Sequence, residues 1–434
     1  MNRTTHTYQI SNLEKFKNQL LHWAQQFEEV AWLDSNTYAD QNYKSYDAIL
    51  AVDGFTSMKT SYQDAFDRLE EYQHTTKDWL FGYLSYDLKN DIERLKSNND
   101  DFVKFPDLYF FQPKRIFLLK GNEVVLHYLP MVDDEMEYDW KEITNQLLTT
   151  NNNDDTSLRI KLKIHKDAYK NKVRKMLDYI QKGDIYEANF CQEFYAYGTI
   201  HPVETFQHLN RISTPPFATF LKVDDHFLVS ATPERYLKKE GSKVISSPIK
   251  GTAPRSKDVK EDSAFAKALS EDPKERSENI MIVDLVRNDL SRIAQKGSVN
   301  VEELCTVYSF KQVHQMISTV SAQISVGISP VDVIRATFPM GSMTGAPKIR
   351  AMEIIEELEE TKRGLYSGAV GYFTPNGDFD FNVIIRSILY NAEDQYVSYS
   401  VGSAITAKSD PDKEYAECLL KAKAMREVLE RKTG

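Results

Sequence analysis

Apolar residues recur along this chain with two periodicities, one typical of strands and one typical of helices. In the first third of the chain, short apolar or alternating runs predict four strands, over residues 48–52, 79–86, 115–119 and 123–129. Helical spacing predicts helices at about residues 11–28 and 61–74. This part of the chain therefore mixes both kinds of element.

The pattern is clearer beyond residue 160. Helical spacing predicts helices over residues 166–181, stopping at Gly183, and over 262–294, 347–360 and 411–431. Strands are predicted over residues 218–222, 227–231, 243–248, 367–374, 380–391 and 395–405, of which the last three are consecutive and antiparallel. Strand meanders separated by long helices favour an α+β fold over repeated βαβ units.

Two polar stretches without periodicity interrupt the chain, at residues 98–101 (NNDD) and 149–156 (TTNNNDDT). Such stretches are typical of connections. The second one predicts a boundary between an N-terminal region, residues 1–155, with a regulatory or structural role, and a region that carries the candidate chemistry, residues 156–434. We expect the N-terminal strands to be interleaved with the same sandwich.

Composition and charge exclude several classes of function. The 434 residues are 41% hydrophobic and 27% charged, which is ordinary for a soluble globular protein. The net charge is −10 and no long basic stretch occurs, which argues against a nucleic-acid partner. The first ten residues lack the apolar core of an export signal, and no apolar run reaches about 18 residues, so we expect a cytoplasmic protein without a membrane partner. The three cysteines are far apart and indicate small buried residues rather than disulfides or a zinc site.

Two predicted helices each carry a pair of glutamates three residues apart. Glu414 and Glu417 share a helix face with Lys421, which by itself also fits a solvated stripe with a Glu417–Lys421 ion pair. Glu275 and Glu278 repeat the spacing, and the apolar run after Glu278 indicates a helix buried nearly all round. A buried carboxylate needs a partner or a metal, and two such helices facing each other would form an oxygen site suited to Mg²⁺.

A glycine-rich loop, FPMGSMTGAPK at residues 338–348, leads into another predicted helix. It does not fit the phosphate-loop pattern, because Gly341 and Gly345 are too close in sequence and two residues separate the second glycine from Lys348. With Pro347 near the first turn, the free N–H groups favour an anion, either carboxylate or phosphate. A plain loop-to-helix connection has the same pattern.

Lys250 follows a predicted strand and precedes Gly251, in the segment PIKGT at residues 248–252. The glycine permits a close backbone approach. If Lys250 is buried, its amine would lose proton affinity and could act as a nucleophile near neutral pH. An ordinary lysine at a sheet edge is the alternative.

Together these segments resemble the chorismate-using enzymes, a family that includes anthranilate, aminodeoxychorismate, isochorismate and salicylate synthases. The matching segments occur in the family's order, at residues 231–235 (ATPER), 248–252, 278–289 (ENIMIVDLVRND), 338–348, 385–387 (IRS) and 414–417 (EYAE). Residues 32–35 (WLDS) and 81–87 (FGYLSYD) match more weakly. The resemblance implies an α+β fold of two large antiparallel sheets packed across each other, with flanking helices and the site in a cleft.

The resemblance also implies roles for the matching residues. Glu278 and Glu417 are expected to ligate Mg²⁺, supported by Glu275 and Glu414, and the ion is expected to hold the ring carboxylate of chorismate. Glu234 is expected to protonate the departing 4-hydroxyl. His314 is expected beside the reacting ring. The other residues expected around the substrate are Glu187, Gly251, Thr252, Ser342, Tyr366, Arg386, Gly402 and Lys421.

Lys250 narrows the resemblance, because aminodeoxychorismate synthases typically carry lysine at this position where anthranilate, isochorismate and salicylate synthases carry alanine. A lysine amine that adds at C2 expels the 4-hydroxyl with an allylic shift. Ammonia then adds at C4 and expels the lysine, so that one difficult substitution becomes two easier ones. The resemblance thus implies conversion of chorismate and ammonia to 4-amino-4-deoxychorismate, in 4-aminobenzoate and folate biosynthesis.

Two positions depart from the family's pattern. Glu187 stands where relatives usually carry glutamine, or lysine in the isochorismate and salicylate enzymes, where the lysine serves as base for water. The missing lysine argues against those two activities. Ala404 stands where a glycine is usual, in the loop expected to shape the carboxylate pocket.

The ammonia is expected to come from a separate glutamine amidotransferase subunit. Such an enzyme needs a nucleophilic cysteine in a glycine-flanked turn, and Cys191, Cys305 and Cys418 lack these surroundings. Two alternatives stay open: an anthranilate synthase component I, which Lys250 disfavours, and a non-catalytic chorismate- or amino-acid-binding regulator, which the complete set of acid, lysine and metal carboxylates disfavours. Residues 32–35 resemble a motif that lines an amino-acid pocket in relatives, so we expect only modest regulation by tryptophan.

Overall fold

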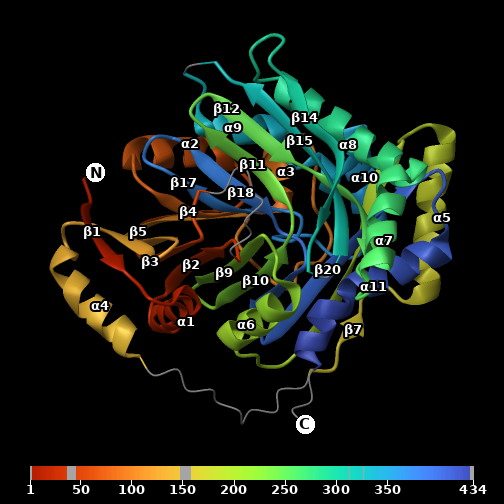
Figure 1. Cartoon of the computed structure of the whole chain (residues 1–434). Helices are drawn as coiled ribbons and strands as arrows, with labels where there is room; N and C mark the ends of the chain where they lie inside the picture. The colour runs from red at the N-terminus through yellow and green to blue at the C-terminus, as the bar shows by residue number, and fades with distance from the viewer. Residues whose placement is uncertain (1, 37–44, 147–157, 312, 326, 431–434) are drawn as a thin grey trace.

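The computed structural model describes residues 2–36, 45–146, 158–311, 313–325 and 327–430 (Figure 1). Its 20 strands form one hydrogen-bonded sheet in which neighbouring strands are antiparallel. The helices are α1 (Leu13–Ala24), α2 (Ala65–Thr76), α3 (Lys89–Ile92), α4 (Met136–Asn145), α5 (Lys166–Lys182), α6 (Pro202–Ser213), α7 (Val259–Glu271), α8 (Pro273–Ser291), α9 (Pro330–Thr337), α10 (Lys348–Leu358) and α11 (Pro411–Leu429), with short 3₁₀ turns η1 (Tyr86–Leu88), η2 (Asp133–Glu135) and η3 (Gly341–Met343). The α+β class is therefore confirmed.

The sheet divides into two at the long strands β3 (Ala48–Thr60) and β5 (Leu108–Lys120), which belong to both parts and pair irregularly between Gly54 and Thr56. The first sheet continues from them, on one side through β6 (Glu123–Tyr128) to β1 (Thr4–Gln9), and on the other through β2 (Glu29–Asp34), β9 (Phe217–Val223), β10 (His226–Thr232), β19 (Ser387–Asn391), β20 (Tyr396–Thr406) and β8 (Glu187–Tyr197) to β7 (Lys161–Leu162) and β16 (Gly345–Ala346). The second sheet continues through β4 (Leu80–Leu84), β17 (Ala369–Phe373), β18 (Phe379–Val383), β11 (Arg235–Glu240), β12 (Lys243–Ser247) and β15 (Val313–Gln323) to β14 (Asn300–Ser309) and β13 (Ile249–Pro254).

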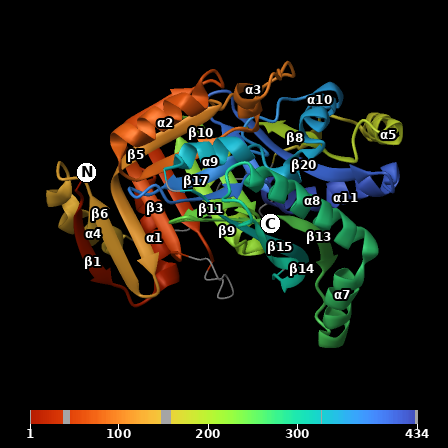
Figure 2. The same ribbon diagram turned by 90° about the horizontal axis from the view of Figure 1, so that it is seen from above.

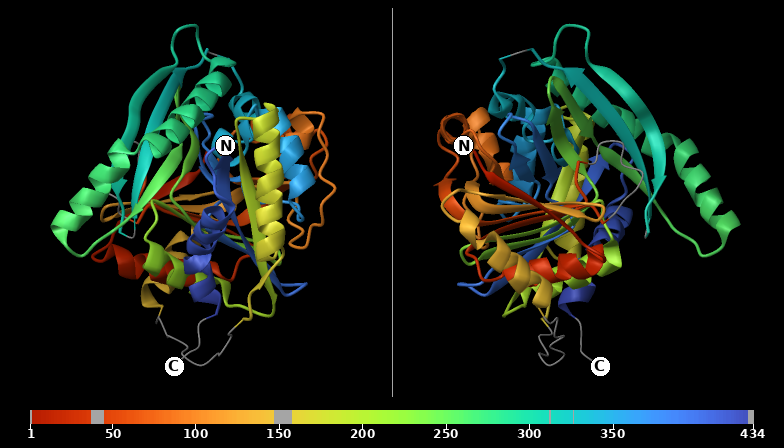
Figure 3. Two further views of the ribbon diagram at one scale, coloured as in Figure 1. Left: turned by 90° about the vertical axis from the view of Figure 1, so that its right-hand side faces the viewer. Right: turned by 60° about the vertical axis from the view of Figure 1, so that its left-hand side comes forward.

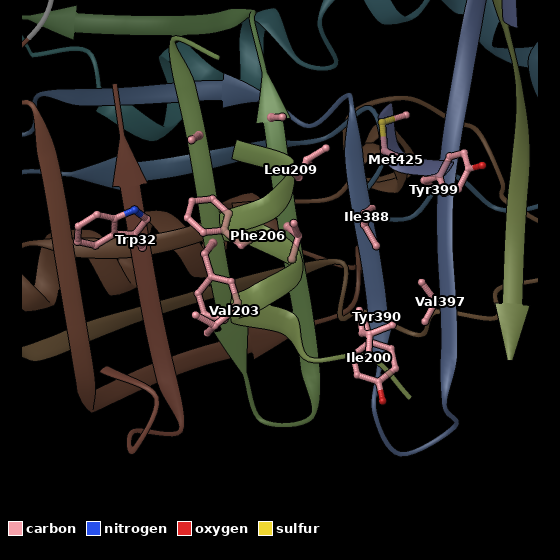
Figure 4. Close-up of a cluster of buried hydrophobic side chains, with 14 of the residues drawn as sticks. Trp32, Ile200, Val203, Phe206, Leu209, Ile388, Tyr390, Val397, Tyr399 and Met425 are labelled. Carbon is pink, nitrogen blue, oxygen red and sulfur yellow. The ribbon is translucent and has the colours of Figure 1, made fainter. Parts of the chain in front are cut away.

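Two apolar layers hold these sheets. One lies between the inner faces of the two sheets and includes Ile49, Phe81, Phe110 and Leu389. The other lies between the outer face of the first sheet and helices α1, α4, α5, α6, α10 and α11. Figure 4 shows part of this second layer, where Val203, Phe206 and Leu209 of α6 pack toward the strands that carry Trp32, Ile388 and Tyr390. Burial on both faces makes the first sheet a rigid platform.

The hairpin of β14 and β15 and helix α7 project away from this body (Figures 2 and 3). Helix α8 runs back from α7 across β13 and β15, which it contacts along its length. Thus α8 connects the projecting hairpin with the sheets, and its side chains face the junction between them.

Most predicted elements are present, with two differences. The predicted helix over 262–294 is two helices, because Asp272 is extended and its side chain caps α8 by accepting from the N–H groups of Lys274 and Glu275. The predicted strand over 380–391 is also two, since the backbone of Arg386 has φ 52° and leaves the sheet. The predicted domain boundary within 149–156 lies outside the described residues. The pairs β2–β9 and β4–β17 join strands from either side of it.

Candidate active site

Two crossings of the chain between the sheets bring Glu234 and Arg386 together. The segment after β10 passes from the first sheet to β11 of the second at Glu234, and the segment after β18 passes back to β19 at Arg386. The crossings are hydrogen-bonded to each other, since Val383 N–H donates to the Glu234 carbonyl (3.0 Å) and Ala231 N–H donates to the Arg386 carbonyl (3.1 Å). Both side chains therefore start from a fixed backbone at the junction of the sheets.

Glu234 has the environment of a general acid. Its side chain is buried, with 4% of the residue exposed, and Ser342 Oγ in η3 donates a hydrogen bond of 2.5 Å to its carboxylate. Burial raises the pKa of Glu234 to about 7, although Ser342 and the charge of Lys250 act in the opposite direction. A large fraction of Glu234 is thus protonated near neutral pH, as proton donation requires.

Lys250 on β13 lies among carboxylates. It is partly buried, and no hydrogen bond or ion pair joins its side chain to the residues that the structure describes. Its positive charge opposes the rise in pKa of Glu187 and Glu234, and also acts on Glu278 and Glu417. The surroundings of Lys250 are therefore acidic as well as apolar, which the sequence did not predict.

Gly251, next to Lys250, permits the close approach of α8. Its φ is +97°, and a Cβ at this position would lie 3.2 Å from the Glu275 carboxylate and 3.2 Å from Met316. A side chain at this position would therefore meet Glu275 and Met316 and would also be strained by the positive φ. Thr252 follows on the exposed part of β13, where it pairs with Gln315 of β15.

Glu187, the first residue of β8, is another buried acid beside Lys250. Only 2% of it is exposed, and its Oε2 has no hydrogen-bond partner among the described residues. Burial raises its pKa, Glu278 adds to the rise and Lys250 reduces it. Glu187 therefore belongs to the same electrostatic cluster as the α8 carboxylates.

The two glutamate-bearing helices lie close enough for their carboxylates to interact. Burial raises the pKa of Glu278 on α8, and Glu414 and Glu417 on α11 raise it further. Glu275 has a raised pKa for the same reasons, burial first, then Glu278 and at longer range Glu417. Each carboxylate thus disfavours the charge of the others, which a cation between the helices would relieve.

The site residues on α11 are held by β20. Ser403 donates a hydrogen bond to Glu414, and Lys421 Nζ lies 2.6 Å from Glu417 Oε1 and 3.1 Å from the carbonyl oxygen of Gly402. Burial raises the pKa of Glu417, but the adjacent Lys421 outweighs burial and the net pKa is lowered. The Glu417–Lys421 pair that the sequence alone allowed is therefore formed.

No three His, Cys, Asp or Glu side chains in the described parts of the chain are grouped closely enough to enclose a metal ion. The chemistry of the donors nevertheless fits Mg²⁺, because they are carboxylates and Glu278 Oε1 is buried without a hydrogen-bond partner among the described residues. Lys274 Nζ, 3.6 Å from this oxygen, is the nearby cation that the sequence did not predict.

Arg386 supplies positive charge to the site, and the neutral phenol of Tyr366 lies near it. Burial lowers the pKa of Arg386, and its guanidinium has no hydrogen bond or ion pair with the described residues. It lines a cavity with Ala231, Pro233 and Gln315. Tyr366 is buried nearby and accepts a weak hydrogen bond from the Cys191 thiol, 3.8 Å away. A partly buried guanidinium that is not paired with any of the described residues is suited to binding a carboxylate.

His314 is held by two side-chain contacts. One ring nitrogen lies 3.0 Å from Asp262 Oδ1 and the other 2.9 Å from Ser309 Oγ. Its neighbour Gln315 points to the opposite face of β15, lines the Arg386 cavity and has a buried Oε1 without a partner among the described residues. Gln315 therefore lies at the cavity wall, while the place of His314 beside the reacting ring stays a prediction.

A buried ion pair that the sequence did not reveal fixes the loop of Ser342. Arg363 binds both carboxylate oxygens of Glu359, at 2.6 and 2.9 Å, and donates to the carbonyls of Met343 (2.7 Å) and Asn189 (2.6 Å). It therefore ties η3 to β8. The i,i+4 spacing of Glu359 and Arg363 allows the ion pair, but no local pattern identifies the bonds to Met343 and Asn189, because these carbonyls are distant in sequence.

A second cavity lies beside the segment that resembles an amino-acid pocket. Leu33, Asp34 and Ser35 line it together with Tyr46 and Arg235. Trp32 points the other way, into the layer under α6 (Figure 4). The binding of tryptophan in this cavity stays a prediction.

Comparison with known proteins identifies relatives of this chain in sequence and in structure. Aminodeoxychorismate synthase component 1 of Bacillus subtilis is 33% identical over 385 residues, covering 85% of this chain and 82% of the relative. Anthranilate synthase component 1 of Thermus thermophilus is 35% identical over 358 residues, covering 81% and 77%. The crystal structure of anthranilate synthase component I from Streptococcus pneumoniae superposes with a TM-score of 0.76 at 27% identity, covering 90% of this chain and 94% of that one.

The more distant isochorismate synthase MenF of Escherichia coli shares the fold, with a TM-score of 0.74 at 15% identity over 99% of this chain and 95% of that one. The predicted fold is thereby confirmed beyond the α+β class. None of the helices in the described segments is long and apolar enough to cross a membrane. Residues 25–427 match the chorismate binding enzymes, so this chain belongs to that family and is an enzyme that acts on chorismate.

Proposed function

We propose that this enzyme converts chorismate and ammonia to 4-amino-4-deoxychorismate, the reaction that leads to 4-aminobenzoate and folate. The observation that carries the proposal is Lys250, an amine without a protein partner among the described residues, placed beside the buried acid Glu234. An enzyme that only adds ammonia directly at C2 has no need for an amine at this place. The ammonia is supplied by a separate glutamine amidotransferase subunit.

In the proposed first step, the neutral amine of Lys250 forms a bond to C2 while the C4–O bond breaks with an allylic shift. Glu234, protonated near neutral pH, gives its proton to the departing oxygen, which leaves as water. Lys250 becomes a secondary ammonium on C2, and Glu234 becomes a carboxylate. Its new negative charge faces the new positive charge, which stabilises this intermediate.

In the second step, ammonia forms a bond to C4 and the C2–N bond to Lys250 breaks, so the lysine leaves as a neutral amine. The amino group on C4 carries the surplus proton, and Glu234 accepts it. Lys250 and Glu234 thereby return to their starting protonation states. Glu187, buried next to Lys250, contributes negative charge that stabilises the cationic intermediate.

The binding of the substrate is assigned to the charged groups around this pair. Arg386, without a protein partner among the described residues, binds one carboxylate of chorismate, and Lys421 reaches the same site from α11. Glu278 and Glu417, supported by Glu275 and Glu414, would hold Mg²⁺. When bound, the ion supplies positive charge for the second substrate carboxylate.

An anthranilate synthase component I is the second candidate, favoured by relatives of that name at a similar level of identity. Identification of the product distinguishes the two. The purified chain is incubated with chorismate, Mg²⁺ and an ammonium salt, and the products are separated by chromatography after treatment with a 4-aminobenzoate-forming lyase. The proposal predicts the para-amino product. Formation of the ortho-amino product instead would identify the chain as an anthranilate synthase.

A further inference from the structure

Lys274, in the first turn of α8, lies beside the carboxylates of the metal site, and the proposed function gives it no role. Its Nζ is 3.6 Å from Oε1 of Glu278, the residue one helical turn further along. This distance is too long for a hydrogen bond, and Oε1 is buried without a hydrogen-bond partner among the described residues. The two side chains are therefore joined by charge alone, in a pair that can open without breaking a hydrogen bond.

All four glutamates of the metal site act on this amine. Burial lowers the pKa of Lys274, but nearby negative charges outweigh burial and raise it. In decreasing order of effect, these charges belong to Glu278, Glu275, Glu414 and Glu417. The first turn of a helix disfavours a positive charge, because the helix dipole is positive at that end. The carboxylates of both helices, and not α8 itself, therefore favour the charged amine at this place.

Lys421, the lysine that faces the site from α11, is held more firmly. Its Nζ is 2.6 Å from Glu417 Oε1 and 3.1 Å from the carbonyl oxygen of Gly402, so two contacts fix it to its own side of the site. The side chain of Lys274 is 42% exposed, and its Nζ forms no hydrogen bond with the residues that the structure describes. Of the two lysines, Lys274 is thus the one that can leave.

We propose that Lys274 is the internal counter-ion of the Mg²⁺ site and that Mg²⁺ displaces it on binding. This inference rests on the Mg²⁺ site of the proposed function. Without the metal, the ammonium group offsets part of the repulsion among the four glutamates. Mg²⁺ carries twice the charge and approaches carboxylate oxygens to about 2.0–2.1 Å, so it replaces an ammonium group held at 3.6 Å. The flexible stem of the lysine then carries the amine into solvent.

This exchange has two consequences that can be measured. Because Mg²⁺ has to replace an existing ion pair, its affinity is lower than the four glutamates alone would provide. Because the lysine is in place only when the metal is absent, it stabilises the metal-free protein and contributes little to the stability of the loaded one.

The first experiment measures Mg²⁺ binding by titration calorimetry, with the full chain freed of metal by chelation and without chorismate. Lys274→Gln removes the competing charge and should bind Mg²⁺ about tenfold more tightly than the wild type. Lys267→Gln is the matched control, because it makes the same charge change in an exposed pair of the same spacing, with Glu271 on α7. The control should stay within about twofold of the wild-type affinity.

The second experiment compares melting temperatures without metal and at saturating Mg²⁺. Metal-free Lys274→Gln should melt a few degrees below the metal-free wild type, because the glutamates lose their counter-ion. At saturating Mg²⁺ the difference should disappear. Lys274→Arg keeps the positive charge and should restore both the wild-type affinity and the melting temperature of the metal-free protein.

The proposal is overturned if Lys274→Gln binds Mg²⁺ with the wild-type affinity or more weakly, since the lysine would then not compete with the metal. A melting difference of equal size with and without Mg²⁺ would also overturn it, because the lysine would then stay in place in the loaded protein. A wild-type chain that binds no Mg²⁺ would refute the metal site and this inference together. None of these measurements uses chorismate, so an ortho-amino product would overturn the proposed function and leave their outcome unchanged.

Discussion

Burial raises the pKa of Glu234, and Ser342 reduces this rise because its hydroxyl donates to the carboxylate and so favours the charged form. Activity that needs the protonated acid should fall as the pH rises through about 7. Ser342→Ala removes the bond that lowers the pKa, so the pKa of Glu234 rises further and the falling limb of kcat/KM should move to higher pH. A pH profile of both enzymes measures this. An unshifted limb would show that another group controls it.

In the proposed mechanism, Lys250 determines whether the new amino group is added at C4 or at C2 of chorismate. Without its amine, C2 is open to direct attack by water or ammonia. Lys250→Ala should therefore lose 4-amino product by about a hundredfold or more, and the residual turnover should shift toward C2 products. The control is Lys257→Ala, which changes an exposed lysine a few residues further along the chain. Wild-type amounts of 4-amino product from Lys250→Ala would exclude the covalent role.

The carboxylates of α8 and α11 predict a dependence on Mg²⁺. Glu278→Gln and Glu417→Gln each remove one negative charge and keep the volume, so the fold should persist while the apparent affinity for Mg²⁺ falls by about tenfold or more. Activity titrated with Mg²⁺ after chelation measures this, with the exposed Glu427→Gln of α11 as control. Equal activity of the variants at limiting Mg²⁺ would rule out this metal site.

The sequence identifies functional residues only where they belong to a motif of the family. Glu234, Lys250, Glu278 and Glu417 stand in segments whose order matches a family, and the structure brings their charges within range of one another. The acidic surroundings of Lys250 depend on four separate elements, which no local pattern connects. That Gln315 lines the Arg386 cavity depends on which face of β15 it occupies, and the register shifts on both sides of that strand make this hard to predict from the sequence.

At the scale of elements, the Glu359–Arg363 pair holds β8, α10 and η3 in one arrangement. Arg363→Met leaves Glu359 as an uncompensated buried charge, and we expect a loss of about 3–5 kcal/mol in the free energy of unfolding. Arg350→Met breaks a half-exposed pair with Glu353 and should change it by less than about 1 kcal/mol. Urea denaturation of both variants provides the comparison. Equal losses would contradict a special role for the buried pair.

The sequence predicts the helices better than the strands. Most helices bury only one face, so their apolar residues recur with a clear helical period. Strand β8 (Glu187–Tyr197) is buried on both faces and carries Glu187, Gln192 and Glu193 among its apolar residues, so it lacks the alternation that marks a half-exposed strand. Asp272-Pro273 is a typical start of a helix. The helical spacing continues on both sides of it, however, so the spacing alone predicts one helix instead of two.

At the scale of the whole molecule, the source of ammonia is testable. Cys191, Cys305 and Cys418 are all buried, and burial raises the pKa of the Cys191 and Cys418 thiols to about 12 and about 11. A thiol held protonated in this way is a poor nucleophile toward glutamine. Ammonium salts should therefore support turnover by the pure chain, whereas glutamine should not. Glutamine-dependent product from the pure chain would refute the need for a partner subunit.

The two-sheet architecture was accessible only through the resemblance to a family. Local periodicity gives the class of the fold, but the pairings that define it join distant segments, such as Phe81 with Tyr372 and Trp32 with Phe220. A pattern of single residues does not encode which strand lies beside which. Only the whole set of motifs, in order, carries that information here.

The division of the sheet at β3 and β5 also governs how the enzyme is made. Strand β4 occupies the second sheet between β5 and β17, and its partner β17 begins at Ala369, near the other end of the sequence. At about 5–20 residues per second, a ribosome delivers that partner on the order of tens of seconds after β4. During this time one edge of β4 is an open template for foreign strands. We therefore expect the yield of active enzyme to fall when this edge is not shielded until translation is almost complete.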